Sequence, residues 1–402
     1  MTDIVIIGGG IAGLYCGYKL TKMRPDLNFV ILERDRRQET PTRVSAGRLG
    51  SQLFEGTWVS CGGGIGTYES KLLLELLDQL EVPYNWFDMH KKTDNPNDAV
   101  WFRDVIDVLR TNCHEMNGLS FSDFAQQYLS SDEYTRLMYI SGFRDYLDND
   151  SYNVLKYYGL EDNANDVPAF SCKWGDLVSA LYRVLEGMIH FDREVERLVY
   201  VDHMIVVHCK ENKYVTNKVI CATAIDGLKK LFDCPVYHSI AGQSCLRMYA
   251  KIKDPTDINQ VMSGFQIVKV KNMSQQMITI NPKKGIFMPV YCDNLNADIL
   301  SKYMEPTSEN KKIVERLIDE SIQTYLHKSI PTEIINMVGF YEPNSIHIFT
   351  PLKISLKQFM KEIQYPKPHV LVVGEAVALQ HGWVENALQS TYPLENFVKN
   401  NT

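Results

Sequence analysis

Three glycines near the N-terminus have the types and spacing to bind a phosphate group. Gly8, Gly10 and Gly13 form G-x-G-x-x-G between a short apolar run and an apolar-periodic segment that ends at Pro25. The pattern predicts a strand, a tight turn and a helix. Gly8 permits the turn, Gly10 lets a pyrophosphate approach the backbone, and Gly13 allows close packing of helix on strand. Glu33 ends a second apolar run and is placed to accept hydrogen bonds from a ribose diol, so the unit predicts dinucleotide binding.

The segment after Glu33 indicates which dinucleotide is bound. Arg37 is followed by "SAGRLGS", which contains Arg48, and this region resembles the E-x-x-x-R-x-G-G-R element of the flavin-containing amine oxidase family. Ala46 stands in place of the first glycine, and the stretch from Arg37 to Ala46 is longer than the usual pattern, which predicts an extra surface loop. The last arginine of the element approaches the FAD pyrophosphate in that family. The resemblance therefore implies FAD, with Arg48 near its diphosphate.

The C-terminal segment supplies a second part of the resemblance. "HVLVVGEAVALQHGWVENALQ" is similar to the family's G-E-x-(loop)-G-W-V-E-G-A segment, with Asn386 where glycine is usual. In the family the acid, here Glu375 after Gly374, meets the ribityl or phosphate region, and the following helix begins against the flavin ring. The pattern predicts a strand at 369–373 and a helix that opens near Gly382. We expect this segment to complete the sheet that begins at residue 3.

A third match lies between the two ends. Residues 189–224 alternate as a meander of strands, and Val195 begins a V-x-x-L element that contacts adenine in the family; Thr223 and Ala224 replace the usual proline. Taken without the resemblance, Val195 is a core valine. The resemblance also implies cofactor contacts from Ile11, Ala12, Arg34, Arg37, Gly47, Gly63, Gly64, Ile65, Trp383 and Val384.

The whole chain resembles, in order, the monoamine, polyamine and L-amino acid oxidases of this family. Its short length is similar to compact members carried by some large DNA viruses and microbes. The implied fold class is α/β, a Rossmann-type FAD-binding domain interleaved with an α+β substrate domain. We expect the FAD-binding domain to comprise 1–74, 186–234 and 363–402, and the substrate-binding domain to comprise 75–185 and 235–362. Within the latter, strands are predicted at 261–270 and 275–281 and a helix at 309–327.

A strand in the second domain carries the residue of greatest chemical interest. In "SCLRMYAKI", residues 244–252, Leu246 and Met248 alternate with Arg247 and Tyr249. On alternation alone, Arg247 belongs to a solvated strand face. The resemblance places it where the family has a lysine bridged by water to flavin N5, so we expect it to face the flavin. A guanidinium stays charged and only donates hydrogen bonds, unlike a buried lysine amine.

Two further residues complete the candidate catalytic set. Trp383 matches the aromatic wall of the family's cage beside the flavin. His347 lies near the position of the opposite wall, and is either a substrate contact or an interior strand histidine with hydrogen bonds. Ser345 lies near the position at which some relatives carry a cysteine linked to FAD, so we expect the flavin to be bound noncovalently.

Composition narrows the classes of partner and the compartment. The chain has 402 residues, a net charge of −7 and 45% apolar residues, which predicts a soluble two-domain protein and disfavours nucleic acid as a partner. Its nine cysteines form no C-x-x-C pair and no metal-ligand spacing. No apolar run reaches the length of a membrane span, and the first strand is predicted to begin by Asp3, so we expect neither a membrane anchor nor a signal peptide. We expect reduced thiols, no metal and a cytoplasmic location.

Three functions remain open on the sequence. The leading hypothesis is an FAD-dependent oxidoreductase that oxidises a small amine: the flavin takes the C–H hydride equivalent, the imine hydrolyses, and O2 reoxidises the flavin with release of H2O2. The second keeps the fold and changes the substrate, as in flavin-dependent desaturases and porphyrinogen oxidases. The third is a flavin-binding structural protein with little or no catalysis, which the replacement of lysine by Arg247 favours.

Overall fold

A largely parallel sheet forms the nucleotide-binding half of the molecule. The computed structural model describes residues 2–327 and 331–399. In this sheet β1 pairs in parallel with both β2 and β14, and β20 pairs in parallel with β14. The strand order is β11 (Ile189–His190), β2 (Phe29–Leu32), β1 (Thr2–Ile7), β14 (Lys213–Cys221), β13 (Met204–Cys209), β12 (Val195–Val201), with β20 (Val370–Val372) beside β14. The predicted meander and the predicted C-terminal strand are thus confirmed.

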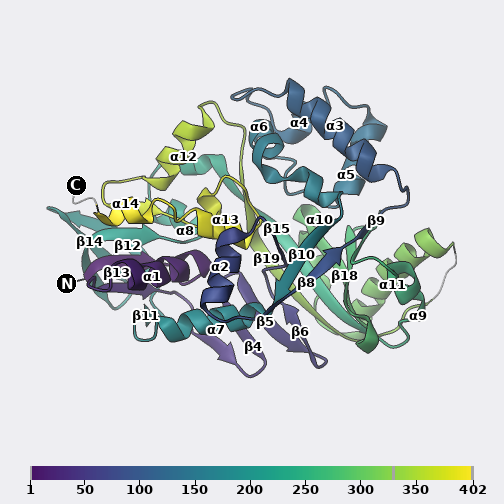
Figure 1. Cartoon of the computed structure of the whole chain (residues 1–402), viewed down its shortest axis with the longest axis horizontal. Helices are drawn as coiled ribbons and strands as arrows, with labels where there is room; N and C mark the ends of the chain where they lie inside the picture. The colour runs from purple at the N-terminus through teal and green to yellow at the C-terminus, as the bar shows by residue number, and fades with distance from the viewer. Residues whose placement is uncertain (1, 328–330, 400–402) are drawn as a thin grey trace.

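Helices cover both faces of this sheet and bring the two ends of the chain together (Figure 1). The face with the N-terminal helix carries α1 (Ile11–Met23), α2 (Lys71–Gln79), α7 (Trp174–Val184), α13 (Val384–Gln389) and α14 (Leu394–Lys399). The opposite face carries α8 (Ile225–Leu231) and α12 (Leu356–Gln364). Lys218 of β14 donates to the carbonyl oxygens of Phe397 and Val398 at 2.7 and 3.0 Å. The first strand and the last helix therefore belong to one unit, as predicted.

A small antiparallel sheet replaces the surface loop that the sequence predicts after Arg37. Its strands are β3 (Gln38–Thr40), β4 (Arg43–Ala46), β5 (Leu49–Phe54) and β6 (Thr57–Ser60), in that order. The loop prediction was wrong because the side chain of Val44 is buried against α7. The contact is close: a Cβ added to Gly175 of α7 would lie only 3.0 Å from the Cβ of Val44. Since α7 packs on α1, β4 and β5, we propose that the nucleotide-binding domain includes 174–185, which the expected boundary at 186 leaves out.

A second, mostly antiparallel sheet lies beside the first half and carries Arg247. Its order is β19 (Ile334–Phe349), β15 (Ile240–Ile252), β18 (Ile286–Asp293), β17 (Gln276–Asn281), β16 (Ile267–Lys269) and β9 (Lys91–Lys92). The pair β9 and β16 is parallel. Helices α9 (Thr256–Met262), α10 (Asn294–Leu300) and α11 (Ser308–Leu326) cover one face. Leu246 and Met248 point to these helices, whereas Tyr249 packs with Phe54 and Val59 of the small antiparallel sheet. The predicted alternation of β15 is confirmed, but its polar side meets protein instead of water.

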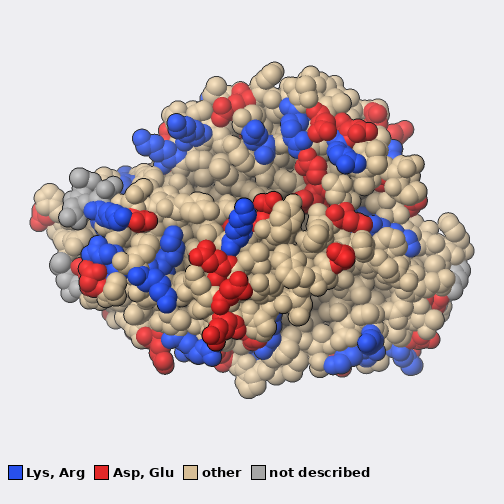
Figure 2. Space-filling model, in the orientation of Figure 1, with Lys and Arg blue, Asp and Glu red and all other residues tan. Residues whose placement is uncertain are grey.

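A group of helices completes the second half of the molecule (Figure 1). The helices α3 (Asp98–Asn112), α4 (Phe121–Ala125), α5 (Ser131–Ser141) and α6 (Ser151–Asn153) enclose an apolar cluster of their own. The strands β7 (Gly66–Thr67), β10 (Val167–Cys172) and β8 (Tyr84–Met89) form a three-stranded sheet that links this group to the rest. In residues 2–327 and 331–399, no helix combines the length and apolarity needed to cross a membrane. Figure 2 shows basic and acidic side chains interspersed over one face.

Candidate active site

The turn between β1 and α1 has the geometry that its glycines predict. Gly8 has φ +104°, and a Cβ there would lie 2.6 Å from the carbonyl oxygen of Ala222. A Cβ at Gly13 would overlap the carbonyl oxygen of Gly8. At Gly10, by contrast, a Cβ would meet no atom within 4 Å. Gly8 and Gly13 are therefore required by the protein's own packing, whereas Gly10 borders open space at the N-terminus of a 13-residue helix, where a diphosphate binds well.

Two further glycine segments border the same helix terminus. Gly47 has φ +53°, and its Cβ position lies 3.4 Å from the Cα of Gly10. Gly374 has φ +113°, and its Cβ position lies 3.8 Å from the Cβ of Ala12. The structure thus brings together the N-terminal, Arg48 and C-terminal segments that the sequence matched separately. Backbone without side chains on three sides of α1 fits a diphosphate chain, which needs close approach to N–H groups.

Glu33 directly follows β2, beside this turn. One carboxylate oxygen accepts a hydrogen bond from the N–H of Gly9 at 2.6 Å, and the other accepts from the N–H of Asp35 at 2.9 Å. Each oxygen keeps a lone pair for a hydroxyl donor. Arg34 and Arg37 lie in ion pairs with Asp35 and Glu39, and the Arg34 side chain is 73% exposed. The structure therefore holds Glu33 at the glycine turn and places the two arginines at the surface.

Arg48 and Glu375 form an ion pair between the segments, in which Glu375 is buried and the Arg48 side chain is 32% exposed. Nη1 of Arg48 donates to Glu375 at 3.0 Å and to the carbonyl oxygens of Asn344 and Ser345. The other oxygen of Glu375 accepts from the N–H groups of His347 and Gly382, at 2.9 and 3.2 Å. Burial alone would raise the pKa of Glu375, but its pairing with His347 and Arg48 holds that pKa well below its usual range. Glu375 therefore stays ionised and ties four segments of the chain together.

His347 lies inside the protein and serves this carboxylate. Its ring is fully buried; Nε2 accepts from the N–H of Ile225 at 3.2 Å, and Nδ1 contacts Glu375. Because Nε2 is an acceptor, the proton lies on Nδ1 and is donated to Glu375. Both ring nitrogens are thus engaged within the protein, which leaves none for a substrate. The contacts are those of the interior strand histidine, and the expected substrate contact has no support in this position.

A second histidine nearby was missed from the sequence. His381 is 3% exposed, its Nε2 has no partner in the described structure, and its ring stands edge-on to Phe349 with centroids 4.5 Å apart. Burial lowers the pKa of His381 to about 4, against the opposing effect of Glu375. The ring is therefore neutral at pH 7 and precedes Gly382 and Trp383 by one and two positions. Only its place in the "LQHGWVE" loop hinted at it.

Trp383 begins α13 and lies half-buried at the helix N-terminus. It is the N-cap residue of α13, followed by Val384, with extended backbone. Glu385 in the same turn accepts from the N–H groups of Leu72 and Leu73 at 3.2 and 2.9 Å. This contact fixes α13 against α2 and so fixes the place of Trp383. Val195 is buried at the start of β12, as a core residue of that strand.

Arg247 is pinned against the segment Ser60–Gly64. Its Nη1 donates to the carbonyl oxygens of Gly62 and Gly63 and to Ser60 Oγ, the last two at 3.2 and 3.3 Å. Its Nη2 donates to Tyr291 Oη at 3.3 Å, and the guanidinium lies 5.1 Å from the centre of that ring. Tyr249 adds a bond of 2.9 Å to the carbonyl oxygen of Ser60. The side chain is half-buried between β15 and the nucleotide-binding half, so the solvated-face interpretation is wrong.

Arg247 is one member of a row that crosses the antiparallel sheet. It pairs with Tyr291 on β18, which pairs with Gln276 on β17, which pairs with Lys269 on β16. Residues directly paired in this way point to the same face. Lys269 is 1% exposed; its Nζ donates to the carbonyl oxygen of Ser141 at 2.8 Å and to Gln276 at 3.1 Å. Burial lowers the pKa of Lys269 well below its usual value.

Two buried carboxyl groups lie beside this row. Asp293 accepts from the backbone N–H groups of Arg144 and Asp145, at 2.7 and 3.0 Å, and from Gln275 at 2.8 Å. Asp145 accepts from the hydroxyl of Tyr158 at 2.6 Å. Burial and the neighbouring charge of Asp293 raise the pKa of Asp145. Sequence patterns gave no sign of this pair, whose members are 148 positions apart.

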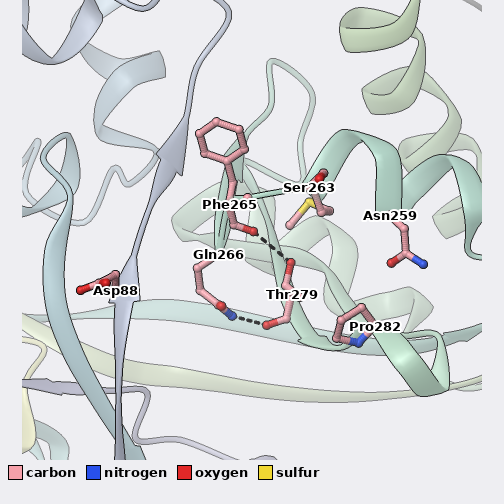
Figure 3. A pocket seen from close by; sticks show the side chains of 9 residues that line it. Asp88, Asn259, Ser263, Phe265, Gln266, Thr279 and Pro282 are labelled. Atoms are coloured by element: carbon pink, nitrogen blue, oxygen red, sulfur yellow. Dashed lines mark hydrogen bonds between the residues drawn. The ribbon is translucent and has the colours of Figure 1, made fainter.

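A surface pocket lies away from these residues. It has a volume of about 350 Å³ and is lined by Asp88 of β8, residues 259–266 around the end of α9, Thr279 and Pro282 (Figure 3). Gln266 and Thr279 bond to backbone carbonyl oxygens within this wall. None of the predicted site residues lines the pocket. Across the described residues no group of three or more histidine, cysteine or acidic side chains has the geometry for a metal ion.

Comparisons with known proteins bear on the fold. A family model described as an NAD(P)-binding Rossmann-like domain matches residues 6–38, and no curated protein sequence matches the chain. Wild-type putrescine oxidase bound to putrescine matches over 99% of both chains, with a TM-score of 0.73 and 12% sequence identity. A triple mutant of that enzyme matches over 98% of both chains, with a TM-score of 0.74 and 13% identity.

The chain has the fold of putrescine oxidase. This full-length match confirms the predicted α/β architecture, with a Rossmann-type domain interleaved with a second domain. The resemblance to flavin amine oxidases is thereby confirmed at the level of the fold. Identity of 12 to 13% carries no substrate over to this chain.

Proposed function

We propose that the chain is an FAD-dependent oxidoreductase that acts on an amine and holds its FAD noncovalently. The observation that carries the proposal is the open backbone at Gly10, where a Cβ would meet nothing within 4 Å although Gly8 and Gly13 are tightly packed. Packing does not require a glycine at that position, but close approach of a diphosphate does. The putrescine oxidase fold supports a flavin at this place.

Named residues of this chain would hold the cofactor. The N–H groups at the start of α1 and the backbone at Gly47 and Gly374 would surround the diphosphate, with Arg48 neutralising charge beside it. Glu33 would accept from the adenosine ribose, and Val195 would contact adenine through its backbone. Trp383 and the start of α13 would border the flavin ring. When bound, FAD would accept two electrons from the substrate and would pass them on to O2.

Arg247 would orient groups at the ring and would not move protons. Its guanidinium remains protonated at every pH at which the protein is folded, so it cannot act as a general base. Its bonds to Ser60, Gly62 and Gly63 fix the segment that includes the expected cofactor contacts Gly63, Gly64 and Ile65. The proposal therefore assigns it a role in positioning the segment and in electrostatics.

A second function is favoured by the same arginine. The bonds of Arg247 join the two halves of the molecule, which is what a flavin-stabilised structural protein requires. In that protein FAD would bind and redox turnover would be slow. A flavin-dependent oxidation of a non-amine substrate has no residue in the described structure that favours it over an amine.

The test begins with the purified protein reconstituted with FAD. Release of FAD on denaturation in trichloroacetic acid would establish noncovalent binding. Anaerobic bleaching of the flavin by monoamines, polyamines or amino acids, followed by rapid reoxidation on mixing with O2, would support the oxidoreductase. Bound flavin that no amine bleaches, and that reoxidises slowly after dithionite reduction, would overturn it in favour of the structural protein.

A further inference from the structure

Arg247 is a half-buried cation without an acidic partner. Its bonds go to Ser60 Oγ, two backbone carbonyl oxygens and the phenol of Tyr291. In residues 2–327 and 331–399, no Asp or Glu oxygen lies within ion-pair distance of its guanidinium, whereas Arg48 pairs with Glu375 at 3.0 Å. A partly desolvated charge without a counter-charge is costly. The position favours an anion supplied from outside the chain.

The guanidinium presents an unused edge. Nη1 makes three of the four bonds and Nη2 makes one, so the Nε–H and the second Nη2 hydrogen donate to no described group. These two hydrogens form a fork that matches the two oxygens of a carboxylate. At Gly64 an added Cβ would meet only Nη2 of Arg247, at 3.8 Å. The backbone of Gly64 beside this edge therefore carries no side chain, and a Cβ there would not touch any other segment.

The neighbouring acids do not cancel this charge. Asp293 is occupied by two backbone N–H groups and Gln275, and Asp145 by the Tyr158 hydroxyl. The raised pKa of Asp145 leaves that buried pair short of its full negative charge at neutral pH. Lys269, at the far end of the row, is satisfied by Ser141 and Gln276. Arg247 is the cation of the row with two adjacent hydrogens that donate to no described group.

We propose that Arg247 binds the carboxylate of the substrate, so that the oxidised amine is an amino acid or another amine that bears a carboxylate. The inference rests on the proposed function for the oxidation step and on the free Nε–Nη2 edge for the substrate class. It predicts that a diamine such as putrescine is a poor substrate. A carboxylate held by this fork would also fix the position of the amino group relative to the segment at Gly64.

The test compares amino acids with the amines made from them by removal of the carboxylate. With the FAD-loaded protein, anaerobic flavin bleaching is followed for ornithine against putrescine and for phenylalanine against phenethylamine. We expect a preference of about 100-fold for the amino acid of the better pair, which corresponds to the loss of charged hydrogen bonds. Arg247→Met should reduce the preference to about threefold or less, and Arg247→Lys should leave an intermediate value because it keeps the charge and loses the fork.

Lys251→Met is the matched control. Lys251 lies on the same strand and the same face, and its Nζ bonds to the carbonyl oxygen of Lys284. The control should keep the full preference. A second readout is calorimetric titration with benzoate, with benzyl alcohol as the uncharged probe, on the wild type and all three variants. Benzoate affinity should fall at least tenfold in Arg247→Met and remain unchanged in Lys251→Met.

The outcomes separate the two proposals. If amines bleach the wild-type flavin as fast as their amino acids, the carboxylate site is overturned and the amine oxidation stands. If nothing bleaches the flavin but benzoate binding is lost only in the Arg247 variants, the carboxylate site stands and the oxidation is overturned. Benzoate affinity that does not change in Arg247→Met, in protein with a wild-type FAD content and melting temperature, overturns the carboxylate site.

Discussion

The glycine turn at α1 and the face of β15 are two halves of one candidate site, and they are built in opposite ways. At α1 the site consists of backbone: Gly8 and Gly13 pack too tightly for any side chain, and Gly10 borders open space. At β15 the site consists of side chains, with Arg247 joined to Ser60 and Tyr291 from distant segments. The packing at Gly8 and Gly13 admits no side chain, whereas a network of side chains can lose one member and keep the others.

The strongest contrast comes from two glycines three positions apart. Gly13→Ala places a methyl group on the carbonyl oxygen of Gly8, so we expect a loss of about 4 kcal/mol or more in the free energy of unfolding, or failure to fold. Gly10→Ala has φ −73°, which alanine adopts freely, and open space for its methyl group. The free energy of unfolding of Gly10→Ala should lie within about 1 kcal/mol of the wild-type value. Its affinity for FAD should nevertheless be at least about tenfold weaker.

Chemical denaturation and FAD titration of both variants check this pair. Equal destabilisation by the two substitutions would contradict the tight packing at Gly13. Unchanged FAD affinity in Gly10→Ala would contradict a diphosphate at the open backbone, and with it the proposed cofactor site.

The next effect tests Glu375, which pairs with Arg48 and contacts His347 of β19. Glu375→Ala leaves the buried His347 and the partly exposed Arg48 without this partner, and we expect a loss of about 3 kcal/mol in the free energy of unfolding, the lower end of the range for a buried pair. Asp26→Ala is the matched control, since Arg24 and Asp26 form a close but exposed pair at 2.6 Å. It should cost about 1 kcal/mol or less. Urea unfolding of both variants measures these losses. If Glu375→Ala and Asp26→Ala lose similar free energies of unfolding, the contacts of Glu375 do not stabilise the fold more than an exposed ion pair does.

The two regions also differ in how far the sequence predicted them. The turn at Gly8–Gly13 was predicted because its glycine spacing and the flanking strand and helix lie within one local segment, although its contact with Ala222 does not. The partners of Arg247 were not, because cross-strand pairing with Tyr291 and contact with Ser60 depend on register and docking between distant segments. The strand at Arg43–Ala46 was predicted as a loop, since its burial against α7 leaves no periodic signal in so short a run.

Buried charge is the most difficult part of such a site to foresee. Lys269 and Asp145 have ordinary sequence surroundings, and only the fold buries them. His347 shows the converse: its strand position suggested two roles, and the tautomer set by Ile225 favours the interior one. Sequence thus predicts sites made by local backbone well, and sites made by tertiary desolvation poorly.

The acid pair beside the row gives a pH-dependent prediction. The pKa of Asp145 is raised to about 8 in the folded protein, from about 4 when unfolded. The folded state therefore binds more protons between these values, and stability falls as pH rises from 4 to 8. The slope from one such group is at most about 1.4 kcal/mol per pH unit. Asp145→Asn keeps an acceptor for Tyr158 and should flatten this slope in melting temperatures measured from pH 5 to 8.

Asp293→Asn is the control that separates charge from hydrogen bonding. Both oxygens of Asp293 accept hydrogen bonds, from two backbone N–H groups and from Gln275. In Asp293→Asn an NH2 group replaces one oxygen and faces another donor, so hydrogen bonding is lost there. This variant should be destabilised at every pH in the range, unlike Asp145→Asn. A slope that persists in Asp145→Asn would show that Asp145 is not the titrating group.

The smallest expected effect comes from the phenol that contacts Arg247. Tyr291→Phe removes the bond of 3.3 Å to Nη2 and keeps the ring, which stands edge-on to Phe143 at 5.3 Å. The guanidinium keeps its three bonds to Ser60, Gly62 and Gly63, so we expect a loss of only about 0.5–1.5 kcal/mol in the free energy of unfolding. Because the substitution releases a second Nη2 hydrogen, benzoate affinity measured by calorimetry should stay the same or rise. If Tyr291→Phe loses FAD binding, the side-chain half of the site is as sensitive to a single substitution as the glycine half. The proposed difference between the two halves would then be wrong.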